Sequence, residues 1–224
     1  MRSFWWKILC ILLFVYVAFA GFLGEVPRLV ILNETIRNLY FHVSIWFGMI
    51  LLMLVSVVFS ILYLSSQKSI HDYWALASAK TGIFLSILGL LTGMVWAKYT
   101  WGAFWTNDVK LNGSAVSVMI YLAYLVLRRA IDQPEKRGRL SAVYNIFAFV
   151  MMIVFIGILP RMEDSLHPGN GGNPGFGTYD LTSSMRMVFY PAVLGWILLG
   201  IWLSEIQVRI KKLKEDLWES ELDS

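Results

Sequence analysis

Two histidines and one tryptophan-rich segment are the groups in this chain that could hold a large flat ligand. The segment WGAFWTND runs from Trp101 to Asp108 between two long apolar runs and is followed by Lys110. His42 and His167 are far from it in the sequence. Imidazole is a suitable axial ligand for haem iron, and aromatic side chains can cover the macrocycle. These residue types therefore indicate a haem site if the fold brings them together.

Other kinds of site find little support in the sequence. Cys10 is the only cysteine, which excludes a disulfide framework, a cysteine-based metal site and the C-x-x-C-H motif of covalent haem attachment. The run GNGGNPGFG lacks the strand, helix and Lys-Ser/Thr that define a phosphate loop. No Ser/His/Asp set, pair of catalytic carboxylates or zinc spacing can be assembled, so we expect no catalytic residues.

The composition is that of an integral membrane protein. Of the 224 residues, 58% are hydrophobic and 15% are charged. Several apolar runs reach the length of about 18 residues that indicates a membrane span. We predict an all-α integral membrane protein whose single domain, 1–224, contains six transmembrane helices. The expected spans are 4–23, 40–64, 75–96, 113–127, 140–159 and 185–203.

The basic residues predict the orientation of these spans. Most of the 19 Lys and Arg residues fall at one end, including those of AIDQPEKRGR after the fourth span, and this end is expected to be cytoplasmic. The net charge of +4 therefore reports topology and does not indicate a nucleic-acid partner. Both termini are then cytoplasmic, and His42 lies outside with the tryptophan-rich loop 98–112 and the loop 161–182, which carries His167.

The two ends of the chain allow alternatives. The first apolar run ends in Ala-Phe-Ala and resembles a cleaved secretory signal, but Gly21 to Leu23 extend it, and we favour an uncleaved span. Residues 205–224 keep helical periodicity and predict a cytoplasmic helical tail. This tail could extend the last span, lie on the membrane surface or dock on a partner.

Each candidate site residue also has a simpler explanation. Tryptophans such as Trp101 and Trp105 gather at membrane interfaces, and a histidine at a helix mouth is commonly interfacial too. The polar group of Asn107, Asp108 and Lys110 favours a binding site, because an aromatic belt needs no such cluster. Haem also carries two propionates, which need basic partners. The basic residues expected on that face are Arg37, Lys98, Lys110, Arg161 and Arg186.

Three segments resemble the haem-handling membrane proteins of cytochrome c maturation, and most closely the CcmC type, haem exporter protein C. They are IRNLYFHVSIW, TGMVWAKYTWGAFWTND and SLHPG, and the resemblance extends over nearly the whole chain. It implies that His42 and His167 are the axial iron ligands, with Arg37 nearby. The chain departs from the family pattern at Phe104 and Asn107, where tryptophans are common, and at Lys110, where arginine is common.

This resemblance implies a delivery protein and not an enzyme. Haem b would be bound non-covalently at the periplasmic side of the bacterial inner membrane and passed to the haem chaperone CcmE. The implied partners, besides the lipid bilayer, are an ABC-type complex of CcmA and CcmB and the small subunit CcmD. A CcsA-type cytochrome c synthetase component is the alternative, since it shares the tryptophan motif. A cytochrome b-like electron-transfer subunit would need histidine pairs inside the spans, and a small-molecule permease would need ionisable groups there.

Overall fold

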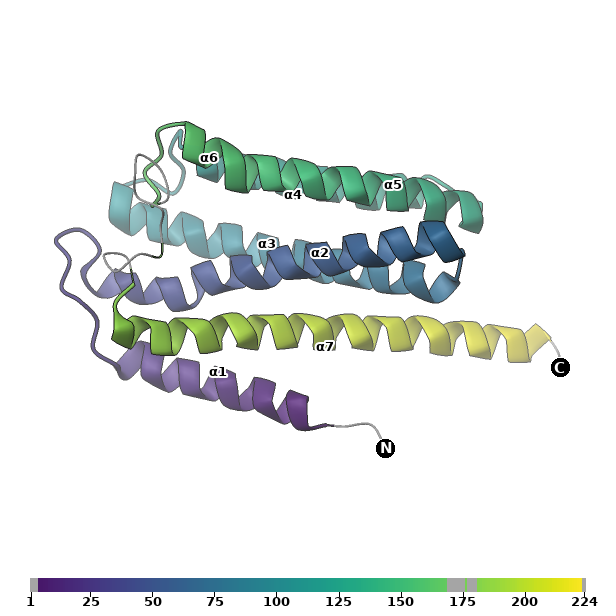
Figure 1. Ribbon diagram of the computed structural model, residues 1–224, viewed down its shortest axis with the longest axis horizontal. Helices are drawn as coiled ribbons and strands as arrows, with labels where there is room; N and C mark the ends of the chain where they lie inside the picture. Colours follow the sequence, from purple (N-terminus) through teal and green to yellow (C-terminus); the bar gives the residue numbers. More distant parts are fainter. Residues whose placement is uncertain (1–3, 169–175, 177–180, 223–224) are drawn as a thin grey trace.

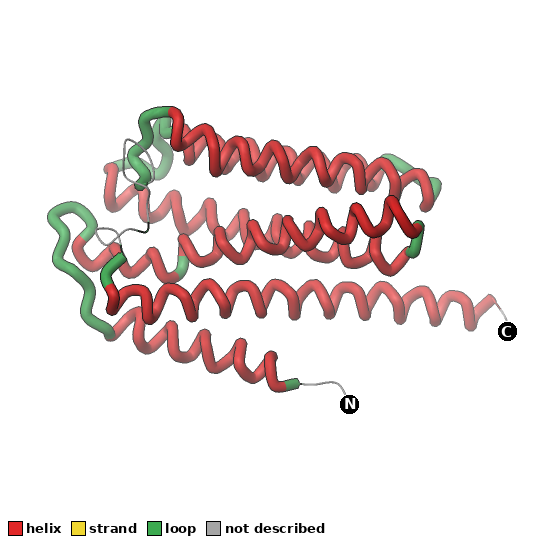
Figure 2. Tube along the Cα trace, in the orientation of Figure 1, coloured by secondary structure: helices red, strands yellow, loops and turns green. Residues whose placement is uncertain are grey.

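The computed structural model describes residues 4–168, 176 and 181–222, and helices are the regular structure of this part of the chain (Figure 2). Six helical stretches are long and apolar enough to cross a membrane, which confirms the predicted all-α, six-span architecture. Two of these stretches contain non-α turns, the 3-10 helix η1 and the π-helical turn η2. The elements are α1 (Trp5–Leu23), η1 (Asn33–Tyr40), α2 (His42–Ser66), α3 (Ser69–Trp101), α4 (Val109–Arg129), α5 (Pro134–Ile153), η2 (Val154–Ile158), α6 (Leu159–Met162) and α7 (Ser183–Leu222).

The long helices run side by side along one axis (Figure 1). Helix α2 is central, because it packs against α3, α5 and α7, whereas α1 lies at the edge and contacts mainly α7. The connections from α1 to α2 and from α3 to α4 lie at the left end of Figure 1, and we call this the cavity end. The connections from α2 to α3 and from α4 to α5 lie at the opposite end, where α7 extends furthest.

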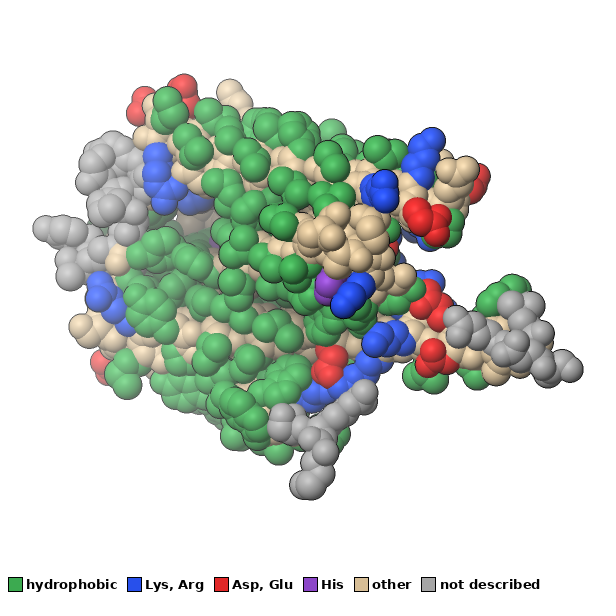
Figure 3. Space-filling model, turned by 45° about the vertical axis from the view of Figure 1, so that its right-hand side comes forward, with side chains coloured by type: hydrophobic (Ala, Val, Ile, Leu, Met, Phe, Trp, Pro, Cys, Tyr) green, Lys and Arg blue, Asp and Glu red, His purple; other side chains and the backbone are tan. Residues whose placement is uncertain are grey.

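Apolar side chains cover the middle of the bundle, and charged side chains gather toward its two ends (Figure 3). This distribution suits a protein whose waist faces lipid tails. Between the helices, the buried amide of Asn145 donates to Ser56 Oγ at 2.7 Å and to Ser60 Oγ at 2.8 Å. Ser56 in turn donates to the Ala75 carbonyl at 2.6 Å. Small polar side chains of this kind join helices in a membrane, where no water competes for their hydrogen bonds.

Helix α3 is longer than the hydropathy pattern predicted. It begins at Ser69 and ends at Trp101, so the α3–α4 connection consists of residues 102–108 and is shorter than the expected loop 98–112. Gly102 ends α3 with a φ of 83°, a left-handed conformation that glycine adopts without strain. Asp108 begins α4 by accepting hydrogen bonds from the backbone N–H groups of Lys110 and Leu111, each at 3.0 Å. Capping residues therefore set the end of α3 and the start of α4. Apolar content alone predicts a longer connection between these two helices.

Helix α7 is a single helix of 40 residues. It contains the sixth predicted span and continues through the predicted tail as far as Leu222, with Pro191 inside it. At the opposite end of the bundle, Tyr73 of α3 donates to the Glu215 carboxylate at 2.5 Å, and Lys211 pairs with Glu215 at 2.8 Å. The described part of the tail thus extends the last span and is attached to α3.

Candidate functional site

A cavity of about 580 Å³ opens at the cavity end between α2, α3, α4 and the η2–α6 segment. Its volume is in the range of sites for small molecules and cofactors, about 300–1,000 Å³. His42 and His167 both line it, so the structure brings the two candidate ligands to one site. The rest of the lining is mainly apolar. Its aromatic members are Trp46, Phe47, Trp96, Trp101 and Phe176.

His42 is the first residue of α2, and its ring lies against α3. Its Nδ1 is 3.0 Å from Oγ1 of Thr92. The ring meets those of Trp96 and Trp46 edge to face, with centroids 5.8 and 6.4 Å apart. A Cβ on Gly93 would lie 2.6 Å from Cε1 of His42, so the ring fits only because residue 93 has no side chain.

His167 is held by the buried carboxylate of Asp108. Its Nδ1 is 2.9 Å from Oδ1 of Asp108, and its ring packs edge to face on Trp101 with centroids 4.8 Å apart. The other oxygen, Oδ2, accepts from the Ser165 hydroxyl at 2.7 Å and from the Leu166 N–H at 2.8 Å. One carboxylate therefore caps α4 and fixes the segment that carries His167.

Asp108 remains ionised at neutral pH. Burial alone would raise its pKa, but hydrogen bonds from His167, Ser165 and the Leu166 backbone outweigh the burial, and the pKa is lowered. An ionised carboxylate only accepts hydrogen bonds, so His167 carries a proton on Nδ1 and its Nε2 is free to bind a metal. This is the arrangement in which a carboxylate orients a metal-binding histidine.

The basic residues divide into those at the cavity and those elsewhere. Lys110 and Arg161 line the cavity, and Arg161 also donates to the Gly157 carbonyl. Arg37, which was expected near a bound haem, does not line it. Its guanidinium pairs with Glu34 at 2.7 Å and donates to the Gly21 carbonyl at 3.0 Å. Arg37 thus joins η1 to the end of α1 because carbonyls there are left without helical partners.

The predicted tryptophans also divide. Trp101 lines the cavity, whereas Trp105 is 41% exposed, lies outside the lining and donates from Nε1 to Asn112 Oδ1 at 3.1 Å. Two residues that were not predicted from the sequence, Trp46 and Thr92, contact His42. A usable signal was present, because Trp46 lies one helical turn after His42.

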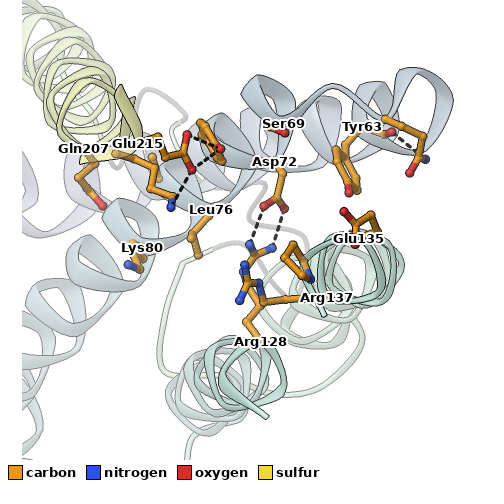
Figure 4. A pocket seen from close by; sticks show the side chains of 15 residues that line it. Tyr63, Ser69, Asp72, Leu76, Lys80, Arg128, Glu135, Arg137, Gln207 and Glu215 are labelled. Carbon is orange, nitrogen blue, oxygen red and sulfur yellow. Dashed lines mark hydrogen bonds and ion pairs between the residues drawn. The ribbon is translucent and has the colours of Figure 1, made fainter. Parts of the chain in front are cut away.

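A second cavity, of about 270 Å³, lies at the opposite end and has a charged lining (Figure 4). There the Arg128 guanidinium forms two bonds of 2.7 Å with the Asp72 carboxylate. Lys80 lines the same space from α3. Within the described residues, no group of three or more His, Cys, Asp or Glu side chains that could hold a metal ion is found at either end.

Comparison with known families decides the assignment. The family profile described as Heme exporter protein C matches residues 1–223 of this chain. The chain belongs to the haem exporter protein C family. Family membership implies a role in haem export for cytochrome c maturation, within the Ccm system and as a transport component. The six candidate spans agree with a multi-pass membrane protein.

Individual relatives in the haem exporter protein C family are distant in sequence. The Heme exporter protein C of Paracoccus denitrificans is 24% identical over 177 residues, which cover 79% of this chain and 73% of the relative. The protein of that name from Escherichia coli K12 is 24% identical over 196 residues, or 85% and 77% of the two chains. The one from Bradyrhizobium diazoefficiens is 30% identical over 115 residues, which cover 51% of this chain and less than half of the relative, 43%.

Proposed function

We propose that this chain binds haem b non-covalently in the cavity between His42 and His167 and delivers it to a haem chaperone. The observation that carries the proposal is that these two imidazoles, distant in the sequence, line one aromatic cavity. His167 has its Nδ1 engaged by Asp108, which leaves Nε2 for iron. His42 would supply the second axial ligand, so that two imidazoles hold the iron.

The other lining residues suit the remainder of the haem molecule. Trp46, Trp96 and Trp101 offer apolar ring surface that would cover the macrocycle and exclude water. Lys110 and Arg161 line the same cavity and would pair with the two propionates. The chain supplies binding and presentation, and we propose no catalytic residue for it.

The proposed partners follow from the family, and the proposed orientation in the membrane follows from the charge pattern. Most basic residues lie at the end opposite the cavity, which would place that end and both termini in the cytoplasm and the cavity on the periplasmic side of the bacterial inner membrane. Haem would then be passed to the chaperone CcmE, with the CcmA and CcmB complex and CcmD bound to the same membrane protein. The proposed partners are tested by co-purification of those proteins with the tagged chain.

The haem ligands are tested by single histidine variants of the full chain, purified from haem-replete cells. We expect a bis-imidazole haem spectrum for the unmodified protein, and we expect His42→Ala and His167→Ala each to lower haem content and abolish that spectrum. His71→Ala is the matched control, because His71 lies at the opposite end and bonds to Ser66 at 2.8 Å. Unchanged haem content and spectrum in both cavity variants would refute the ligand assignment.

Lys110 provides a test of how the propionates are bound. We expect Lys110→Gln to weaken haem binding about tenfold, the effect of one hydrogen bond to a charged group. The measurement is a haem titration, repeated with haem dimethyl ester, which lacks the two charges. The variant and the unmodified protein should bind the ester equally. Lys98→Gln is the control, because Lys98 lies outside the cavity lining and donates to the Gly102 carbonyl at 2.9 Å; a similar loss in that variant would contradict the assignment.

A further inference from the structure

The hydrogen bonds around His42 determine which of its ring nitrogens carries the proton. Thr92 Oγ1 lies 2.9 Å from the Leu88 carbonyl and 3.1 Å from the Gly89 carbonyl of its own helix. A carbonyl can only accept, so the single hydroxyl hydrogen of Thr92 is directed to these oxygens. The lone pairs of Oγ1 are then left to accept from Nδ1 of His42, 3.0 Å away.

The contact with Thr92 fixes the tautomer of His42. His42 therefore carries its proton on Nδ1, and Nε2 keeps its lone pair. Gly93 faces the Cε1 edge of this ring, and a Cβ there would lie 2.6 Å from Cε1 and 3.4 Å from each ring nitrogen.

The two histidines thus share a tautomer and differ in the group that accepts their Nδ1 proton. His167 donates to an ionised carboxylate, and His42 donates to a neutral hydroxyl. Outer partners of this kind orient a metal-binding histidine and raise its basicity as a ligand. A charged acceptor strengthens the hydrogen bond and so increases the electron density on the ring more than a neutral one does.

From this asymmetry we propose that Thr92 is the positioning residue for His42 and that His42 is the weaker of the two haem ligands, the one released first on transfer. The inference rests on the haem site proposed above. It assigns different tasks to the two histidines: His167, held by Asp108, retains the iron, while His42, held by Thr92, opens the coordination position that an acceptor protein needs.

The positioning role is tested by paired substitutions at Thr92. Thr92→Val has nearly the same shape but no acceptor, and we expect it to weaken haem binding about tenfold and to reduce the bis-imidazole fraction of the spectrum. Thr92→Ser keeps the hydroxyl and is expected to restore both properties. Thr81→Val is the matched control, because Thr81 lies on the same helix outside the cavity lining and its hydroxyl donates to the Ala77 carbonyl at 3.0 Å. A wild-type spectrum and affinity in Thr92→Val would overturn this role.

The order of release is tested by comparing the two histidine variants with each other. We expect His42→Ala to keep more haem than His167→Ala, and to lose it more slowly to apomyoglobin, because the stronger ligand remains. Equal retention, or the reverse order, would overturn the asymmetry while leaving the haem site itself intact. If neither variant changed haem content, the proposed function would fail first, so the two failures are distinguishable.

Discussion

Replacing Asp108 with asparagine is expected to lower haem affinity about 10–100-fold, close to the effect of His167→Ala. The Asp108 carboxylate accepts from His167, Ser165 and the Leu166 backbone, and it also caps α4. Asparagine has nearly the same shape, but its amide presents one acceptor oxygen and one donor nitrogen to these five donors. An amide nitrogen facing His167 would move the imidazole proton to Nε2, the nitrogen that is needed for iron.

The measurement is a haem titration with the absorption spectrum recorded at each step. Asp164→Asn is the matched control, since Asp164 is an exposed carboxylate in the segment that carries Ser165 and His167. The pKa of Asp108 is lowered in the folded protein. The ionised carboxylate therefore makes its full contribution to the free energy of unfolding above the ordinary aspartate pKa of about 4, and this contribution is lost as the pH falls below that value. The carboxylate is therefore ionised at pH 7, and the difference in haem affinity between Asp108→Asn and the unmodified protein should be complete at that pH. Wild-type binding by the variant at pH 7 would show that the carboxylate charge is not required.

Gly93→Ala is expected to remove His42 from its position and to lower haem affinity about 10–100-fold. The new Cβ would lie 2.6 Å from Cε1 of His42, closer than real Cβ contacts come. The ring would have to move and would lose its 3.0 Å contact with Thr92. Alanine favours a helix over glycine by about 1 kcal/mol, so the loss would not reflect a weakened α3.

A second glycine gives the control for this experiment. Gly157 lines the same cavity, but a Cβ there would find no atom closer than 3.8 Å. Gly157→Ala should therefore bind haem like the unmodified protein, whereas Gly93→Ala should show the five-coordinate spectrum of a site that keeps only His167. Equal behaviour of the two alanine variants would contradict the close fit of His42 against α3.

Hydropathy and composition were enough to predict the six spans, because a membrane helix must be apolar along its whole length. They do not predict where the helices end, because helix ends depend on individual groups such as the cap at Asp108 and the left-handed Gly102. The segment from Lys98 to Trp101 was assigned to a loop because it is polar and aromatic, yet it forms the last turn of α3. Polar residues continue a helix readily where it leaves the membrane.

The site was predictable in its chemistry and less so in its contacts. His42, His167, Trp101 and Lys110 were selected by residue type, and the structure places all four at the cavity. Arg37 was chosen for its charge and for the resemblance of its segment to the family, and that charge is engaged by Glu34. Thr92 and Gly93 were missed because their importance comes from packing across two helices, which linear spacing does not reveal. The pair Gly89 and Gly93, one helical turn apart, is the sequence signal of that close packing.

The 40 residues of α7 have a mechanical consequence. At 1.5 Å per residue such a helix is about 60 Å long, roughly twice the thickness of the hydrocarbon layer. Near its beginning, Phe189 packs on Phe47 and Phe176, two rings of the cavity wall, with centroids 5.8 and 5.7 Å away. The far end projects beyond the other helices (Figure 1). The helix therefore connects the cavity wall to the projecting end as one continuous element, with no loop between them.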